Sequence, residues 1–92
     1  MIARRLRVHG RVQGVGYRDA MRGAALAASV AGWVRNRRDG TVEAWVQGDE
    51  AAVAQVVLWS RKGPPFARVD HVDAENAAVD ASLRGFDGLP TA

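Results

Sequence analysis

Cysteine is absent from the chain, and its absence excludes several kinds of site. Without a thiol there is no disulfide framework, no thiolate nucleophile and no cysteine-based zinc site. The chain also has no apolar run of membrane-spanning length, and its start lacks the basic-then-apolar layout of a signal peptide. We therefore expect a cytoplasmic protein without a membrane partner.

Lysine is also scarce, because Lys62 is the only lysine among 13 basic residues and all the others are arginine. The net charge is +3, a balance that suits anionic ligands. The arginines form no long block, however, so we expect most of them to lie on a solvated surface. A nucleic-acid partner is not expected on this ground.

The length of 92 residues leaves room for one hydrophobic core, so residues 1–92 are predicted to form a single domain. Hydrophobic residues make up 48% of the chain and charged residues 25%, which is the balance of a globular protein rather than a disordered one. We expect a monomer.

Hydrophobic periodicity changes once near the start of the chain. Apolar and polar residues alternate from Arg5 to Val12, which predicts a strand with one polar face. From Arg18 onward the apolar residues recur with helical spacing, which predicts an amphipathic helix with Met21, Ala24, Ala25 and Ala28 on its buried side.

The middle of the chain predicts a hairpin. Residues 32–37 form one expected strand, Asp39-Gly40 is a hairpin turn signal, and residues 41–47 alternate again. In this third strand the expected inward residues are Val42, Ala44 and Val46, and the expected outward residues are Thr41, Glu43, Trp45 and Gln47.

A second helix is expected after Asp49, which is a plausible N-cap, and Gly63-Pro64-Pro65 should end it. Residues 67–75 predict a fourth strand, in which Val69 and Val72 break strict alternation and suggest a bulge. Residues 76–82 are expected to form a loop, and residues 83–89 a short final strand weakened by two glycines.

The predicted order is β-α-β-β-α-β with a possible short fifth strand. This is an α+β, ferredoxin-like two-layer sandwich with both helices on one face of a mixed, mainly antiparallel sheet. Right-handed crossovers make the first and second strands parallel, with the third antiparallel between them. The loop 13–17 and Asn36 then lie at one sheet edge, two strand spacings or about 10 Å apart.

The loop between the first strand and the first helix predicts an anion site. Gly14 and Gly16 allow backbone N–H groups to converge at a helix N-terminus, and Arg18 adds a planar fork of donors. The loop lacks the third glycine of a dinucleotide fingerprint and the Gly-Lys-Ser/Thr of a P-loop. Together with Asn36 from the neighbouring strand end, Arg18 can bracket a small anion and a water.

Three segments resemble the acylphosphatase family over about residues 5–75. They are Val12-Gln13-Gly14-Val15-Gly16-Tyr17-Arg18, Gly32-Trp33-Val34-Arg35-Asn36 and Asp39-Gly40-Thr41-Val42-Glu43. The resemblance implies hydrolysis of carboxyl-phosphate anhydrides to a carboxylate and inorganic phosphate, without metal or organic cofactor. It further implies that Asn36 orients the attacking water and that the phosphate is held by Arg18 and the loop N–H groups of Gln13, Gly14, Val15, Gly16 and Tyr17.

The chain departs from the family pattern at the end of the first helix. Ala28-Ser29-Val30 stands where the family usually has Leu-Gly-Leu, so Ser29 replaces a left-handed glycine at some cost in stability. Arg37-Arg38 also makes the hairpin unusually basic, and glycine stands where the last strand usually has a β-branched residue.

Two other functions remain open from the sequence. The fold class, the basic balance, and Trp33 and Trp45 on the sheet are compatible with a nucleic-acid-binding module, although the aromatic signature of RNA-binding sheets is absent. A domain that binds phosphate without turnover would show the same loop. His9 and His71 lack flanking ligands, so we interpret them as surface residues rather than a metal site.

Overall fold

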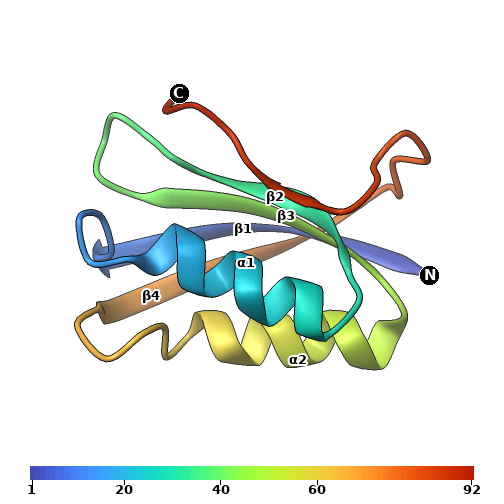
Figure 1. The fold of residues 1–92 in the computed structure, drawn as a ribbon, viewed down its shortest axis with the longest axis horizontal. Helices are drawn as coiled ribbons and strands as arrows, with labels where there is room; N and C mark the ends of the chain where they lie inside the picture. Colours follow the sequence, from blue (N-terminus) through green and yellow to red (C-terminus); the bar gives the residue numbers. More distant parts are fainter.

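The computed structural model describes all 92 residues, which form one five-stranded sheet and two helices. Both helices cover the same face of the sheet (Figure 1), so the predicted two-layer ferredoxin-like sandwich is confirmed. Neither helix is long and apolar enough to cross a membrane. The elements in chain order are β1 (Ile2–Arg11), α1 (Tyr17–Ala27), β2 (Ala31–Asn36), β3 (Val42–Gly48), α2 (Glu50–Ser60), β4 (Arg68–Ala77) and β5 (Phe86–Gly88).

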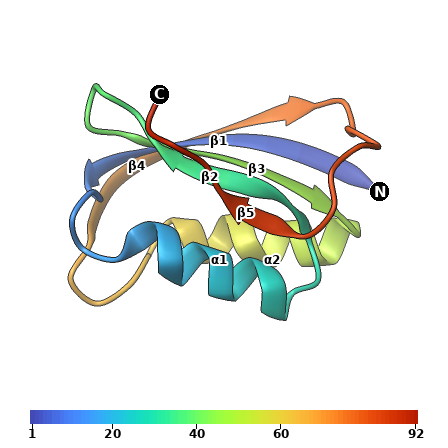
Figure 2. The same cartoon turned by 45° about the horizontal axis from the view of Figure 1, so that its top comes forward.

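The strand order is β4-β1-β3-β2-β5. β3 lies between β1 and β2 and is antiparallel to both, so β1 and β2 run in the same direction as predicted. The end of β1 and the end of β2 therefore meet at one edge of the sheet, beside the start of α1 (Figure 2). β5 adds an edge strand that pairs parallel with β2.

The core lies between the sheet and the helix layer, because the alternating strands and the amphipathic helices turn their apolar faces toward each other. Leu6 and Val8 of β1 are fully buried, and so are Met21 and Ala25 of α1. Val53 and Val56 supply the buried side of α2, where their spacing of three positions places them on one face of the helix. The remaining buried apolar residues of the cluster are Val12, Tyr17, Val30, Val34, Val42, Ala44, Val46, Val72 and Phe86.

The boundaries of β1, β4 and β5 differ from prediction by two residues or more, whereas those of β2 and β3 differ by one. β1 begins at Ile2 rather than Arg5, and β4 continues to Ala77 rather than ending at residue 75. The reason is pairing, because Ala3 lies opposite Ala77 and the ladder extends beyond the alternating stretch. β5 covers only Phe86–Gly88 of the expected residues 83–89, where it pairs with β2.

The predicted bulge in β4 is present. The register shifts between His9 and Gly10, which lie opposite His71 and Val69, so that Asp70 is the extra residue. Gly10 has φ 127°, and a Cβ there would stand 2.1 Å from the Arg68 carbonyl oxygen. The close approach of β4 at the bulge therefore requires glycine at this position.

The residues predicted to point outward from the third strand are on the expected face, with Thr41 directly before β3, but most are not solvated. Thr41, Glu43 and Gln47 are all buried, Glu43 completely. β3 is the central strand, so long side chains from both neighbouring strands cover its outer face. Trp45 lies opposite Trp33 with ring centroids 6.5 Å apart, so the two rings pack against each other across the strands.

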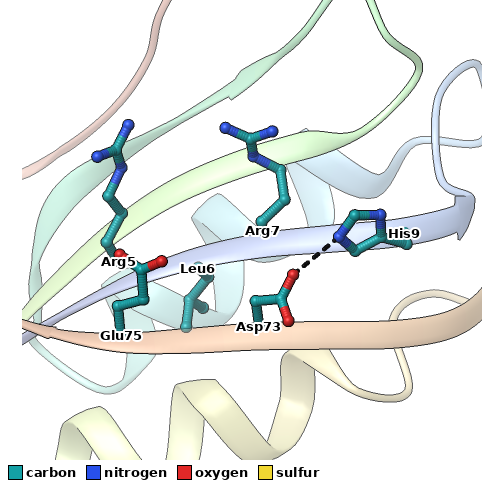
Figure 3. Close-up of a pocket in the computed structure, with 6 residues that line it drawn as sticks. All are labelled: Arg5, Leu6, Arg7, His9, Asp73 and Glu75. Atoms are coloured by element: carbon teal, nitrogen blue, oxygen red, sulfur yellow. Dashed lines mark hydrogen bonds and ion pairs between the residues drawn. The ribbon is translucent and has the colours of Figure 1, made fainter.

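The outer face of the sheet also carries a shallow pocket of about 290 Å³ between β1 and β4, shown in Figure 3. Arg5 and Glu75 line one end of it, and His9 contacts Asp73 with Nε2 3.0 Å from Oδ2 at the other end. His9 has a side chain that is 40% exposed, as expected for a surface histidine. This pocket is on the opposite side of the sheet from the helices and does not contain the predicted site residues.

Candidate active site

A small pocket of about 90 Å³, here called the edge pocket, lies where β1, β2 and α1 meet. It brings together Arg18 and Asn36, which are 18 positions apart in the sequence and come from a helix and a strand end. The residues that line the edge pocket are Val12, Gly14, Gly16, Tyr17, Arg18, Asp19 and Asn36.

The two glycines of the loop adopt backbone conformations that other residues avoid. Gly14 has φ 73°, and Gly16, the N-cap of α1, has φ 79° and ψ 17°. A Cβ at either position would meet no atom within 4 Å, so the requirement for glycine comes from φ rather than from space. Gly16 supplies no side-chain cap, which leaves the first N–H groups of α1 free to bind an anion.

Arg18 is the second residue of α1, and its side chain is exposed and forms no hydrogen bond or ion pair within the chain. A cation in the first turn of a helix is disfavoured by the helix dipole. An anion in the edge pocket would compensate both the positive charge of Arg18 and the partial positive charge of the helix N-terminus. The guanidinium is therefore available to a ligand.

Asn36 is the last residue of β2 and lies opposite Val42 of β3. Its Oδ1 is buried and has no hydrogen-bond partner in the chain. A buried acceptor without a donor is costly, and a water molecule or a ligand hydroxyl can satisfy it. Asn36 thus offers an oxygen acceptor at the wall of a pocket whose other side carries an arginine.

Two predicted binding residues do not line the edge pocket. The side chain of Gln13 instead donates from Nε2 to the carbonyl oxygens of Arg37 at 2.7 Å and Thr41 at 2.9 Å. Val15 is partly buried and packs against the hydrophobic core. Any contact that these two residues make with a ligand would come from their backbone N–H groups.

Sequence reasoning missed two lining residues, Val12 and Asp19. Val12 is buried, and its position at the end of the alternating stretch explained it fully as a core residue. Asp19 stands in the first turn of α1, where a carboxylate is favoured by the helix dipole. Its place directly after Arg18 was the available signal that it also lies at the pocket.

Tyr17 fixes the start of α1 against the end of α2. It is almost completely buried, its hydroxyl donates to the Ser60 carbonyl oxygen at 2.8 Å, and its ring lies 5.4 Å from that of Trp59. Burial raises the pKa of the Tyr17 phenol, so this hydroxyl stays a donor. These contacts of Tyr17 hold the N-terminus of α1 in place beside the loop.

No group of three histidine or acidic side chains is placed to hold a metal ion.

Comparison with known proteins gives a consistent result. The family model described as Acylphosphatase matches residues 4–87. An acylphosphatase of Acidovorax sp. (strain JS42) is 53% identical over 91 residues, which covers 98% of this chain and 92% of the relative. A second acylphosphatase, from Thiobacillus denitrificans, is 56% identical over 82 residues, which covers 89% of this chain and 90% of the relative.

A solved structure extends the agreement to the fold. The crystal structure of acylphosphatase from Bacillus subtilis matches with a TM-score of 0.92 at 35% sequence identity. The match covers 97% of this chain and 99% of that one. The family model, the relatives and the solved structure agree with one another, and the chain belongs to the acylphosphatase family.

Proposed function

We propose that the edge pocket is the active site of this enzyme, with Arg18 and the N–H groups of residues 13–17 holding the phosphate and Asn36 orienting the attacking water. The family activity is hydrolysis of acyl phosphates. The observation that carries the assignment of roles is the buried, unpartnered Oδ1 of Asn36 in the same small pocket as the unpaired guanidinium of Arg18.

The chemistry fits this set of groups. Phosphoryl transfer passes through a loose transition state, in which the protein contributes mainly positioning and charge stabilisation. The carboxylate of an acyl phosphate is a good leaving group, so no strong general acid is needed. Arg18 and the loop N–H groups stabilise charge on the equatorial oxygens, an effect worth a few kcal/mol for each well-placed donor.

Asn36 cannot act as a base, because an amide does not bind a proton near neutral pH. Its Oδ1 can accept a hydrogen bond from a water and hold that water in line with the phosphorus. The water then attacks the phosphorus, the bond from phosphorus to the carboxyl oxygen breaks, and the carboxylate leaves with the bonding electron pair. The proton lost by the water passes to phosphate or solvent.

The proposal is tested by phosphate release from acetyl phosphate in the presence of EDTA. The wild-type chain should turn over the substrate, whereas Arg18→Ala should lose both kcat and substrate affinity, with kcat/KM lower by about a hundredfold or more. Arg61→Ala, which removes an exposed arginine outside the edge pocket, is the matched control and should behave as wild type. Full activity in Arg18→Ala would refute the role of this residue.

The substrate is proposed to be a small-molecule acyl phosphate, and the pocket of about 90 Å³ offers room for its phosphate group. The monomeric state, the cytoplasmic location and the absence of a nucleic-acid partner stay predictions. Phosphate binding without hydrolysis would favour a binding domain instead.

A further inference from the structure

Gln13 joins two parts of the active site that the sheet itself does not connect. Its side chain extends from the loop after β1 to the hairpin after β2, where Nε2 donates to Arg37 O at 2.7 Å and to Thr41 O at 2.9 Å. β1 and β2 are not neighbours, because β3 lies between them. No ladder hydrogen bond therefore links the loop that carries Arg18 directly to the strand end that carries Asn36.

The two acceptors belong to the residues beside Asn36 and its cross-strand partner. Arg37 follows Asn36, and Thr41 precedes Val42, which lies opposite Asn36. The Arg37 N–H also donates to Thr41 O at 2.8 Å, so the hairpin closes next to the Asn36–Val42 pair. Gln13 thus donates both hydrogens of its amide nitrogen to the closing residues of this hairpin.

We infer that Gln13 is a positioning residue, whose side chain sets the distance between the phosphate-binding loop and Asn36. The inference rests on the proposed roles of Arg18 and Asn36. Its physical basis is that the carboxamide of Gln13 does not line the edge pocket, and that both of its N–H donors bind carbonyl groups of the hairpin. A water held by Asn36 then keeps a fixed place relative to a phosphate held by the loop.

The consequence of losing this bridge is a change in the rate rather than in phosphate binding. A displacement of about 1 Å in a reacting group can lower a rate by up to about a hundredfold. The N–H groups of the loop and the guanidinium of Arg18 do not depend on the Gln13 side chain for their presence. The affinity for inorganic phosphate should therefore change much less than kcat.

The test uses Gln13→Met, which keeps the length of the side chain and removes its donors. For acetyl phosphate we expect kcat to fall by about tenfold to a hundredfold, with the inhibition constant of inorganic phosphate changed by less than about threefold. Gln55→Met on the exposed side of α2 is the matched control and should leave both constants unchanged. A rise in the inhibition constant as large as the fall in kcat would overturn the inference.

A double-mutant cycle shows whether Gln13 acts through Asn36. In an Asn36→Ala background, Gln13→Met should cost little further activity, because the water has already lost its acceptor. Equal losses in both backgrounds would indicate a general structural effect and would contradict the inference. If Gln13→Met does not fold, as judged by its thermal melt, Gln13→Asn replaces it, since an amide shortened by one methylene cannot reach both carbonyls.

The same measurements separate failure of the inference from failure of the proposed function. Unchanged kcat in Asn36→Ala and Arg18→Ala would refute the proposed function itself. Large losses in those two variants, with wild-type kcat in Gln13→Met, would refute only the positioning role of Gln13.

Discussion

Ser29 is the only residue other than glycine with a left-handed backbone, with φ 59° at the end of α1. The surrounding hydrogen bonds require this conformation. Val30 N–H donates to Ala25 O and Ser29 N–H donates to Leu26 O, which is the Schellman pattern of a helix C-terminus. The sequence predicted this conformation because the family usually places glycine here.

Replacing Ser29 by glycine should stabilise the chain by up to about 1 kcal/mol, because a residue with a Cβ is strained in the left-handed region. Ala28→Gly is the control, since Ala28 has φ −85° and gains nothing from the freedom of glycine. It should lower stability by about 0.5–1 kcal/mol. Urea denaturation midpoints measure both changes, and a loss of stability in Ser29→Gly would contradict the account.

The phenol of Tyr17 should contribute to stability through its single buried hydrogen bond to Ser60 O. Tyr17→Phe keeps the ring and leaves that carbonyl without a donor, so the free energy of unfolding should fall by about 1–3 kcal/mol. Denaturation followed by tryptophan fluorescence measures the change, with the partly buried Trp59 ring beside Tyr17 as reporter. An unchanged midpoint would show that the bond does not hold α1 against α2.

Glu43 is the centre of a charged cluster that ties β1, β2 and β3 together on the outer face of the sheet. Its carboxylate accepts from Arg5 Nε at 2.8 Å, Arg35 Nε at 2.8 Å and Arg37 Nη1 at 3.0 Å. Burial by itself would raise the pKa of Glu43, but the hydrogen bonds from the three arginines outweigh it and lower the pKa to about 2. Arg35 and Arg37 flank Asn36, so the cluster also holds this strand end from the face opposite the core.

This cluster predicts a specific dependence of stability on pH. The pKa of Glu43 is lower in the folded chain than its ordinary value of 4.5, so its stabilisation is complete above that value and is lost as the pH falls toward about 2. The contribution at neutral pH is on the order of 3 kcal/mol. Glu43→Gln should lose this stability at pH 7 and show a flatter stability profile between pH 5 and pH 2.

Glu75→Gln is the control for this profile, because Glu75 is exposed on β4 and forms no ion pair. The Glu75→Gln variant should lose stability between pH 5 and pH 2 almost as the wild-type chain does. A Glu43→Gln variant as stable at pH 7 as wild type would show that the arginines are equally well accommodated without the carboxylate, and it would contradict the role given to the cluster.

At the scale of the elements, the sequence predicted the strands, helices and turns that depend on local patterns of hydrophobic residues and on turn-forming residues. The alternation of β3, the helical spacing of α1 and the bulge in β4 are all local patterns, and the structure contains each of them. The burial of Glu43 was not predictable from alternation, which assigns a face but not what covers it. That cover comes from arginines on two other strands, and only the sheet order brings them together.

At the scale of the whole molecule, the predicted strand order made it possible to place the site from the sequence. Parallel β1 and β2 place the loop and Asn36 at one edge, and the edge pocket is found there with Arg18 in its wall. The direction of the Gln13 side chain was not predictable, because the motif is compatible with a ligand contact as well as with a bridge to the hairpin. Its acceptors are carbonyl groups that carry no side-chain signal.

The central claim is that the two sides of the edge pocket have different roles. Arg18 and the loop bind the phosphate, whereas Asn36 binds the attacking water. The most direct test is the kinetics of Asn36→Ala with acetyl phosphate, together with competitive inhibition by inorganic phosphate. We predict that kcat falls by on the order of a hundredfold or more while KM and the phosphate inhibition constant change little. Wild-type kcat in Asn36→Ala, or a loss of phosphate binding as large as the loss of rate, would contradict the account.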